Sequence, residues 1–560
     1  MRLTELSIKN FRSLEALTFK VPQICALIGP NNAGKSNILE AIKRVLGRDW
    51  LRVTDFTEDD VFCRNAEADI SIEAHFDPPL HYEAFKDVTP VSIFGFSFEF
   101  THYKIGPQKG QRRLEQLCLD ALGKPPFVPA AAPKSGQKTQ YRPLVSIPAD
   151  LREQVPLIYI GTDRSLERHL PSARHGSILR QLFEDIARDL ETSGETMEIE
   201  AGTSFKQTPR FDRFRQLMEA TIETIRTASF QELEASLKRN ALLMLGFDPV
   251  KDTDKLDLYF GSLTPMDFYR GLDLRVREGS FDISATALGQ GMQNAIVLSL
   301  LQVLEERRKQ GAIILIEEPE MFLHPQMQRF LYRTLRTLGT TNQVIYTTHS
   351  PHFVSVPEFR DVVLVRRPQL ASTVVLSTLP KAAVSGEKLR KELDPERNEL
   401  FFATRLLLVE GDTEKLAFPE YAARLGIDLD RAGSTIVEVG GKRNIPDLAS
   451  VAISLSIPTG IVYDEDSPEF KDRRQEEALF NAKLDALARP DATVRVWRLT
   501  KDFEDHVRRA VGEAKYQHLC QRFSTEAGRS KPIKQRLIAR DGDTSIPEEF
   551  VELLVWLAGY

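Results

Sequence analysis

Two groups of residues in this chain are of the types that handle phosphates and divalent cations. The first is GPNNAGKS at residues 29–36, where glycines surround a lysine that is followed by a serine. The second is a set of acids, in VEG at residues 409–411 and YDED at residues 463–466, each directly after an apolar run. The first group suits a nucleoside triphosphate, and the second suits Mg²⁺. Their presence on one chain restricts the function more than either does alone.

Residues 29–36 fit the pattern GxxxxGK[ST], whose backbone N–H groups point at phosphates from the start of a helix. An apolar segment at 24–28 precedes it, and apolar residues at 38, 39, 42 and 45 then predict a helix. Lys35 is expected at the β- and γ-phosphates and the Ser36 hydroxyl at Mg²⁺. The predicted nucleotide-binding residues are Gly29, Asn31, Asn32, Gly34, Lys35 and Ser36.

A second apolar strand, AIILIEEPE at 312–320, ends in two carboxylates. Glu317 is expected to hold Mg²⁺ and Glu318 to polarise the attacking water. The first of these positions is more often Asp, so the longer arm of Glu317 is a departure. A later strand ends in TTHS at 347–350, which places His349 to reach the γ-phosphate.

These motifs resemble the ABC-type ATPases of the structural-maintenance and recombination-repair class. The match includes IKNFRSLEAL at 8–17, the AGKS loop, EEPExxLHP and THSP. ALGQGMQN at 287–294 resembles the family's signature loop, with Gly289 and Gly291 at its glycine positions. In this family the signature of one subunit caps ATP held by another, so the resemblance implies a homodimer or higher assembly. It covers residues 1–165 and 270–385.

The intervening residues 166–269 are predicted to be a helical insert that serves dimerisation. One apolar stripe in this insert has the spacing of an amphipathic helix and comprises Phe211, Phe214, Met218, Ile222 and Ile225. Such a stripe is expected to be core, with a pairing surface for a second subunit as the alternative.

The acidic residues of the second group each follow a predicted strand of an α/β region, which begins at residue 401 after a linker at 386–400. Ligand sites of parallel sheets gather at the carboxyl ends of strands. Asp464 and Asp466 are two residues apart in an extended segment, so their side chains are expected to converge. Together with Glu410 they would repel one another strongly unless a cation neutralised them. Oxygen ligands favour Mg²⁺ or Mn²⁺ over zinc.

Further residues extend this site. Glu414 lies one helical turn after Glu410, and Glu504 follows the apolar segment 494–499 and would complete a second metal position. Two such ions activate a water and stabilise the leaving oxygen in phosphodiester hydrolysis. Lys531 is the candidate to stabilise the transition-state charge, with Lys534 as its rival. Asp412 and Glu465 are read as simple exposed acids.

Glu–Gly followed by Asp-x-Asp after apolar strands resembles the Toprim domain. An ABC-type ATPase in front of a Toprim domain resembles the OLD (overcoming lysogenization defect) nucleases and the nuclease subunit of Gabija antiphage systems. The resemblance implies an ATP-regulated, metal-dependent DNA endonuclease or nickase in antiphage defence, with a helicase or other defence partner in some systems. The alternative is a non-cleaving, RecF-like repair scaffold. A topoisomerase needs a DNA-cleavage domain, for which no segment of this chain remains. A primase normally has a zinc module, which the scattered cysteines of this chain do not supply.

Length and composition indicate a soluble globular protein of two or three domains, and the motifs with their alternating strands and helices place it in the α/β class. The 560 residues are 42 % hydrophobic and 28 % charged, and no apolar run is long enough for a bilayer. The first residues lack the apolar stretch of a signal peptide, so a cytoplasmic location and no membrane contact are expected. The net charge of −6 excludes a uniformly basic nucleic-acid binder but leaves local contacts with DNA open.

Overall fold

The computed structural model divides into two compact units, which are described separately. Unit 1 comprises Met1–Thr162 and Gln310–Tyr560, and unit 2 comprises Asp163–Lys309. The predicted linker at 386–400 lies outside the described residues except for its last five positions. The structure describes residues 1–47, 51–86, 88–132, 139–164, 166, 178–201, 204–244, 248–251, 264–269, 272, 274–278, 281–307, 311–353, 361–367, 374–377, 396–466, 471–491 and 493–559.

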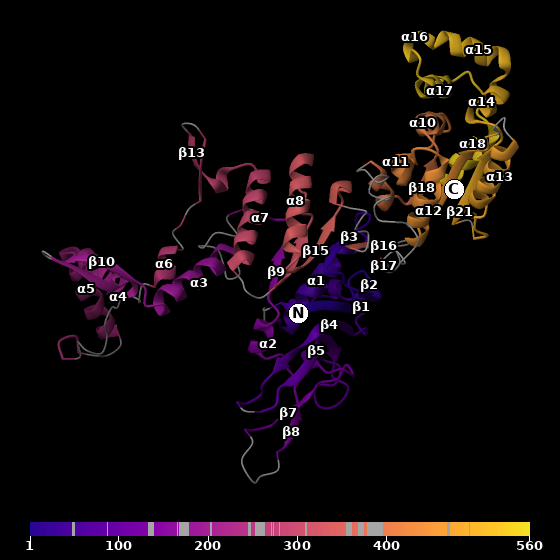
Figure 1. Cartoon of the computed structure of the whole chain (residues 1–560). Helices are drawn as coiled ribbons and strands as arrows, with labels where there is room; N and C mark the ends of the chain where they lie inside the picture. Colours follow the sequence, from indigo (N-terminus) through magenta and orange to yellow (C-terminus); the bar gives the residue numbers. More distant parts are fainter. Residues whose placement is uncertain are drawn as a thin grey trace. The chain divides into compact units, whose positions relative to one another are not determined.

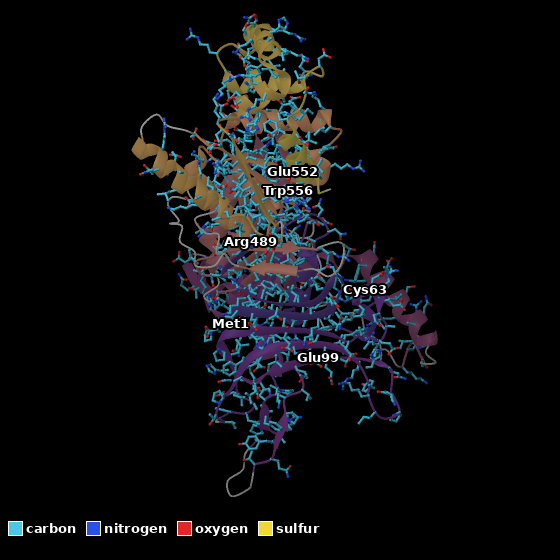
Figure 2. The ribbon with its side chains drawn as sticks, turned by 90° about the vertical axis from the view of Figure 1, so that its right-hand side faces the viewer. Met1, Cys63, Glu99, Arg489, Glu552 and Trp556 are labelled. Carbon is cyan, nitrogen blue, oxygen red and sulfur yellow. The ribbon has the colours of Figure 1, made fainter. Side chains whose placement is uncertain are left out.

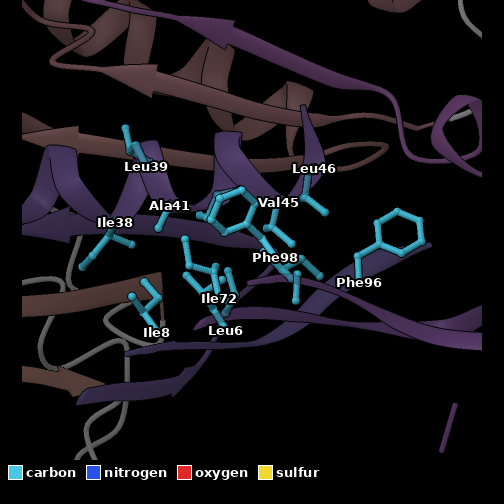
Figure 3. Packing of buried hydrophobic residues seen from close by; sticks show 14 of the residues in the cluster. Leu6, Ile8, Ile38, Leu39, Ala41, Val45, Leu46, Ile72, Phe96 and Phe98 are labelled. Atoms are coloured by element: carbon cyan, nitrogen blue, oxygen red, sulfur yellow. The ribbon is translucent and has the colours of Figure 1, made fainter. Parts of the chain in front are cut away.

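Unit 1 begins with a five-stranded antiparallel sheet (Figure 1). Its order is β2-β1-β4-β5-β6, formed by β2 (Leu14–Lys20), β1 (Arg2–Phe11), β4 (Ile70–Tyr82), β5 (Val91–His102) and β6 (Arg112–Leu119). Buried and exposed residues alternate along β4, which is typical of a sheet with one covered face. That face packs against α1 (Lys35–Leu46), where Ile38 and Val45 join Leu6, Ile72 and Phe98 in one core (Figure 3).

A six-stranded sheet carries the glycine-rich loop. Its order is β17-β16-β3-β15-β14-β9, formed by β17 (Val374–Ser377), β16 (Val362–Arg366), β3 (Ile24–Ile28), β15 (Gln343–Thr348), β14 (Ile313–Glu317) and β9 (Leu157–Ile160). All neighbours pair in parallel except β16 and β17. Every residue of β3 and of β15 is buried, as expected for a parallel sheet covered on both faces. Parallel pairing brings the carboxyl ends of β3, β15 and β14 to one edge.

The C-terminal part of unit 1 holds a four-stranded, fully parallel sheet. Its order is β19-β18-β20-β21, formed by β19 (Ser434–Glu438), β18 (Arg405–Val409), β20 (Thr459–Asp464) and β21 (Val494–Leu499). Seven helices of eight or more residues accompany these strands among the described residues: α10 (Asp412–Arg424), α12 (Ile445–Ser454), α13 (Lys471–Asp485), α14 (Phe503–Val511), α15 (Glu513–Arg522), α17 (Lys531–Arg540) and α18 (Glu548–Ala558).

Aromatic residues fill the core of this C-terminal part. Phe418 of α10, Phe503 of α14 and Phe550 of α18 contact one another with ring centroids 4.9–5.7 Å apart. On β20, a Cβ at Gly460 would lie 2.8 Å from both Leu407 and Trp556 of α18, a residue labelled in Figure 2. Glycine therefore allows α18 to pack closely on the sheet.

Unit 2 is mainly helical. Its main helices are α3 (Ile178–Thr192), α4 (Arg210–Ile225), α5 (Ala228–Met244) and α7 (Gln290–Arg307), with the hairpins β10 (Thr196–Ala201)–β11 (Ser204–Pro209) and β12 (Arg275–Glu278)–β13 (Phe281–Ser284). The stripe from Phe211 to Ile225 lies along α4, and no residue of α4 is buried. The expectation that this stripe is core is therefore wrong for the single chain. The boundaries predicted for the insert, 166–269, remain a prediction.

Candidate functional site

The glycine-rich loop joins β3 to α1 at the carboxyl edge of the six-stranded sheet. Gly29 has φ 143°, and a Cβ there would lie 2.1 Å from the carbonyl oxygen of Val365 on β16. Gly34, with φ 106°, immediately precedes the first residue of α1. Both positions therefore require glycine. Asn31 and Asn32 are exposed on the same loop, which leaves their polar groups accessible.

Lys35 is buried, and its ammonium group donates to the carbonyl oxygens of Gly29 and Pro30, both at 2.9 Å. Burial lowers the pKa of Lys35 to about 8, although the carboxylates of Glu318 and Glu320 oppose this shift. A buried cation whose charge is only partly compensated is a favourable partner for an anionic phosphate.

The two carboxylates of the EEPE segment take different positions. Glu317, the last residue of β14, hydrogen-bonds with the Ser36 and Tyr159 side chains. Burial raises the pKa of Glu317, and these hydrogen bonds oppose the shift. The structure thus brings together Ser36 and Glu317, the two predicted metal ligands of this half. Tyr159, on the neighbouring strand β9, is absent from the sequence-based prediction, since its partner lies far away in the chain.

Glu318 lies beside the histidine of the TTHS segment. Its Oε1 is 3.7 Å from Nε2 of His349, and its backbone N–H donates to Oγ1 of Thr347 at 3.1 Å. Burial and the nearby charge of Lys35 lower the pKa of His349, so the ring is neutral near pH 7. A neutral imidazole next to a carboxylate can donate or accept a proton at a reacting water. The structure thus places Glu318 and His349 side by side, while their roles toward the attacking water and the γ-phosphate remain predictions.

Glu320 also belongs to this site, although the motifs assign it no role. Its Oε1 accepts hydrogen bonds from the Thr348 hydroxyl and from the backbone N–H of His349, both at 2.7 Å. The side chain is 8 % exposed. Glu320 therefore fixes the backbone that carries His349.

The segment ALGQGMQN belongs to unit 2. Gly289 directly precedes α7, and Gly291 lies in its first turn. The Gln293 side chain donates to the carbonyl oxygens of Thr286 and Leu288, both at 2.8 Å, and thereby fixes the loop against the helix. Participation of Gly289 and Gly291 in nucleotide binding remains a prediction.

The second acidic group lies at the carboxyl edge of the four-stranded sheet. Glu410 follows β18, Glu414 lies in the first turn of α10, Asp464 ends β20, and Glu504 lies in the first turn of α14 after β21. Oε2 of Glu410 accepts from the backbone N–H of Asp464 at 3.3 Å, which joins the ends of β18 and β20. Asp466, which is exposed and has φ 47°, completes the group.

Burial and mutual repulsion raise the pKa of two of these carboxylates. Burial, followed by the charges of Glu414, Glu410, Glu504 and Asp466, raises the pKa of Asp464 to about 8. Burial and the charges of Glu410 and Glu504 likewise raise the pKa of Glu414 to about 7. The five predicted acids therefore form one electrostatic cluster.

Two observations test whether the cluster suits a divalent cation. Within the described chain, the buried atoms Oδ1 of Asp464 and Oε1 of Glu504 have no hydrogen-bond partner. Such orphaned oxygens among repelling carboxylates are ligands that suit a cation. However, no three His, Cys, Asp or Glu side chains among the described residues lie in an arrangement that would ligate a metal as it stands. The donor chemistry fits Mg²⁺ or Mn²⁺, while the side chains must still adjust to form a coordination shell.

Lysines neutralise part of this charge. Nζ of Lys531, the first residue of α17, lies 2.8 Å from Oε2 of Glu504. Nζ of Lys442 lies 2.7 Å from Oδ2 of Asp466. Lys534, the rival of Lys531, forms no ion pair in the described part of the chain. Sequence reasoning identified Lys531 but missed Lys442, whose only local signal is the preceding pair of glycines.

Two acids were read as simple exposed residues. Asp412 begins α10, is exposed and carries no ion pair among the described residues, whereas Glu465 is half-buried and pairs with Arg498 of β21. None of the described helices is long and apolar enough to cross a membrane.

Two family models match the chain. The AAA ATPase domain matches residues 1–124 and 163–354. The TOPRIM domain of overcoming lysogenization defect protein-like chains matches residues 401–466, which include Glu410, Asp464 and Asp466. Both resemblances inferred from the motifs are thereby confirmed, as is the mixed α/β fold with a parallel sheet in the C-terminal part.

Known proteins align along most of the chain. The OLD nuclease of Thermus scotoductus is 31 % identical over 85 % of this chain and 84 % of its own. The Old nuclease of Escherichia phage P2 is 24 % identical over 83 % and 77 %, and endonuclease GajA of Bacillus cereus (strain VD045) is 22 % identical over 79 % and 71 %. With an ATPase domain, a Toprim domain and a relative of this identity along both, the chain belongs to the OLD nuclease family.

Proposed function

We propose that this protein is an ATP-hydrolysing, divalent-metal-dependent DNA endonuclease or nickase that acts in antiphage defence. Membership of the OLD nuclease family supports nuclease and ATPase activity, and the similarity to GajA supports the defence role. The observation that carries the proposal is the carboxylate cluster, in which Asp464 and Glu504 each keep a buried oxygen without a partner in the described chain.

Mg²⁺ or Mn²⁺ is the metal that this donor set favours. Glu410, Glu414, Asp464, Asp466 and Glu504 would hold it. When bound, a pair of such ions activates a water and stabilises the leaving oxygen of a phosphodiester. Lys531, held by Glu504, would stabilise negative charge on the phosphorus oxygens. Glu410, hydrogen-bonded to the backbone of Asp464, would keep the two strand ends in register around the reacting phosphate.

The ATPase half would regulate cutting. Gly29, Asn31, Asn32, Gly34 and Lys35 would bind the phosphates, and Ser36 and Glu317 would hold their Mg²⁺. Glu318 would polarise the attacking water, and His349 would contact the γ-phosphate. The hydrogen bond between Glu317 and Ser36, together with the approach of Glu318 to His349, supports these roles.

Assembly of two or more copies forms the third part of the proposal. Gly289 and Gly291 would cap ATP bound to a second copy. The apolar stripe of α4 supports pairing, because none of its residues is buried in the single chain. The domains proposed are an ATPase domain at 1–165 and 270–385, a dimerising insert at 166–269, a linker at 386–400 and a Toprim domain at 401–560. The proposed location is the cytoplasm, and the proposed partner is a helicase or another defence protein.

Incubation with supercoiled plasmid tests the proposal. Wild-type protein in Mg²⁺ or Mn²⁺, with and without ATP, is expected to give nicked or linear product, while Asp464→Ala gives none and still hydrolyses ATP. Glu552→Gln is the control, because this exposed acid of α18, labelled in Figure 2, pairs only with Arg495 among the described residues and is not one of the five predicted metal ligands. Intact plasmid with active ATP turnover in every lane would instead favour a non-cleaving DNA-repair scaffold.

A further inference from the structure

The buried side chain of Lys442 contacts the segment Asp464–Asp466, called the Asp464–Asp466 turn below, at several points. The Lys442 side chain is 6 % exposed. Its ammonium nitrogen lies 2.7 Å from Oδ2 of Asp466 and 3.0 Å from Oε2 of Glu477, a residue of α13. It also donates to the backbone carbonyl oxygens of Asp464 at 3.1 Å and Glu465 at 3.4 Å. One side chain thus contacts all three residues of the turn.

The loop that carries Lys442 also contacts the neighbouring strand end. Gly440 and Gly441 precede it with φ 71° and 109°, a conformation that favours glycine. The backbone N–H of Gly441 donates to the carbonyl oxygen of Glu410 at 2.9 Å. The loop therefore connects the end of β18 with the turn after β20, the two segments that supply Glu410, Asp464 and Asp466.

Two opposite effects on a nearby cation follow from a lysine in this position. Its positive charge would repel the ion, whereas its contacts would hold the ligands in place. Lys442 shares Glu477 with Arg443, and Arg443 also pairs with Glu476. Both glutamates lie outside the carboxylate cluster, so the charges of these four side chains are locally balanced. Among the described residues, Lys442 is the one cation paired with Asp466, and without it Asp466, 52 % exposed and at positive φ, would have fewer restraints. The positioning effect should therefore dominate.

We propose that Lys442 is a positioning residue for divalent-cation binding, which fixes the Asp464–Asp466 turn and orients the Asp466 carboxylate. This inference rests on the metal site assigned under the proposed function. Residues that orient metal ligands typically change metal affinity 10- to 100-fold when they are replaced.

Arg443 offers a matched control. It is also cationic, lies next in the chain and pairs with Glu477 and Glu476. Among the described residues it forms no hydrogen bond or ion pair with Asp464–Asp466. Lys442→Met and Arg443→Met therefore both remove one positive charge and an ion pair with Glu477. Only Lys442→Met removes contacts with Asp464–Asp466, and Arg443→Met also removes the contact of Arg443 with the Phe480 ring.

The experiment is calorimetric titration of the full-length protein with Mn²⁺ alone, in the absence of DNA and nucleotide. Lys442→Met is expected to weaken Mn²⁺ binding by about 10-fold or more, whereas Arg443→Met stays within about 2-fold of wild type. Urea unfolding followed by the fluorescence of Trp497 and Trp556, which lie in the core of the C-terminal part, reports whether each variant is folded. Equal or tighter Mn²⁺ binding by folded Lys442→Met would overturn the inference, and tighter binding would show that the lysine competes with the ion.

Two further samples make the result unambiguous. If Lys442→Met does not fold, Glu477→Gln replaces it. Lys442 then loses the carboxylate that it shares with Arg443, so Mn²⁺ binding should weaken several-fold, and unchanged binding would overturn the inference. Asp464→Asn separates the inference from the function on which it rests. Wild-type affinity that does not respond to Asp464→Asn would overturn both, whereas a response to Asp464→Asn without one to Lys442→Met would overturn only the role of Lys442.

Discussion

The Glu320 carboxylate accepts a hydrogen bond of 2.7 Å from the backbone N–H of His349, and the same oxygen accepts the Thr348 hydroxyl. Glu320 is the last acid of EEPE on the loop after β14, and His349 directly follows β15, so the contact joins neighbouring strands at the ATP-binding edge. The other carboxylate oxygen, Oε2, is buried and has no partner in the described chain. Burial also raises the pKa of Glu320.

The rate of ATP hydrolysis after replacement of Glu320 should therefore depend on whether an acceptor oxygen is kept, more than on whether the negative charge is kept. Glu320→Gln retains an oxygen for both donors, and we expect most ATP turnover to remain. Glu320→Ala leaves two donors without an acceptor at a cost of about 1–3 kcal/mol each, and we expect turnover to fall about 10-fold or more. Steady-state phosphate release measures both. Equal rates for the two variants would contradict a positioning role.

Replacements of Glu318 and Glu317 should have different effects, one on the rate of ATP hydrolysis and the other on the affinity for Mg²⁺–ATP. Glu318→Gln is expected to keep ATP affinity and to slow hydrolysis about 10²–10⁴-fold, the usual contribution of a general base. Glu317→Gln should mainly weaken binding of Mg²⁺–ATP, because Glu317 is hydrogen-bonded to Ser36. Binding of a fluorescent ATP analogue and single-turnover hydrolysis distinguish the two. Normal hydrolysis by Glu318→Gln would remove it from the mechanism.

The metal-free protein should lose stability as the pH rises from about 5 to 8. The pKa of Asp464 is about 8 in the folded state against 3.8 ordinarily, and that of Glu414 is about 7 against 4.5. In this pH range the folded state binds more protons than the unfolded state, so the free energy of unfolding falls as the pH increases. Asp464→Asn should flatten this dependence and raise the Tm at pH 8 by a few degrees. Thermal melts in EDTA at several pH values test it, and a wild-type Tm that rises over this range would contradict it.

The aromatic core of the C-terminal part should respond strongly to truncation. Phe550 is fully buried and contacts both Phe418 and Phe503, so Phe550→Ala should destabilise this part by about 3–5 kcal/mol. Urea unfolding followed by tryptophan fluorescence reports on it, because Trp497 and Trp556 lie in the same core. Leu479→Ala, at a side chain that is 67 % exposed, should change stability by less than about 0.5 kcal/mol.

The stripe on α4 should contribute to assembly. Ile225 is 50 % exposed and apolar, so Ile225→Asp would place a charge in a pairing surface and should reduce the molar mass in light scattering. Thr224→Asp introduces the same charge one residue away, outside the stripe, and should leave the mass unchanged. Equal masses for wild type and both variants would exclude the stripe from the interface.

The sequence predicted those parts of the two sites that are written in contiguous motifs. Gly29–Ser36, the end of β14 and the acids after β18 and β20 were recognisable because each motif combines a strand with the residues that follow it. Glu320, Tyr159 and Lys442 were missed, since their roles depend on partners such as His349, Glu317 and Asp466 on other segments. The α4 stripe was misread because amphipathic spacing reports that a face is covered, not which chain covers it.

The pairing of β9 with β14 has a consequence for how this protein could be shortened or recombined. The two strands are parallel neighbours, with Leu157 opposite Ile313, and unit 2 is the chain that joins them. The chain thus leaves the sheet at the carboxyl end of β9 and re-enters it at the amino end of the neighbouring strand β14. Parallel neighbours require a crossover of about a dozen residues or more. Unit 2 is therefore no detachable appendage, and any lineage or engineered protein that lost it would need a new crossover in its place.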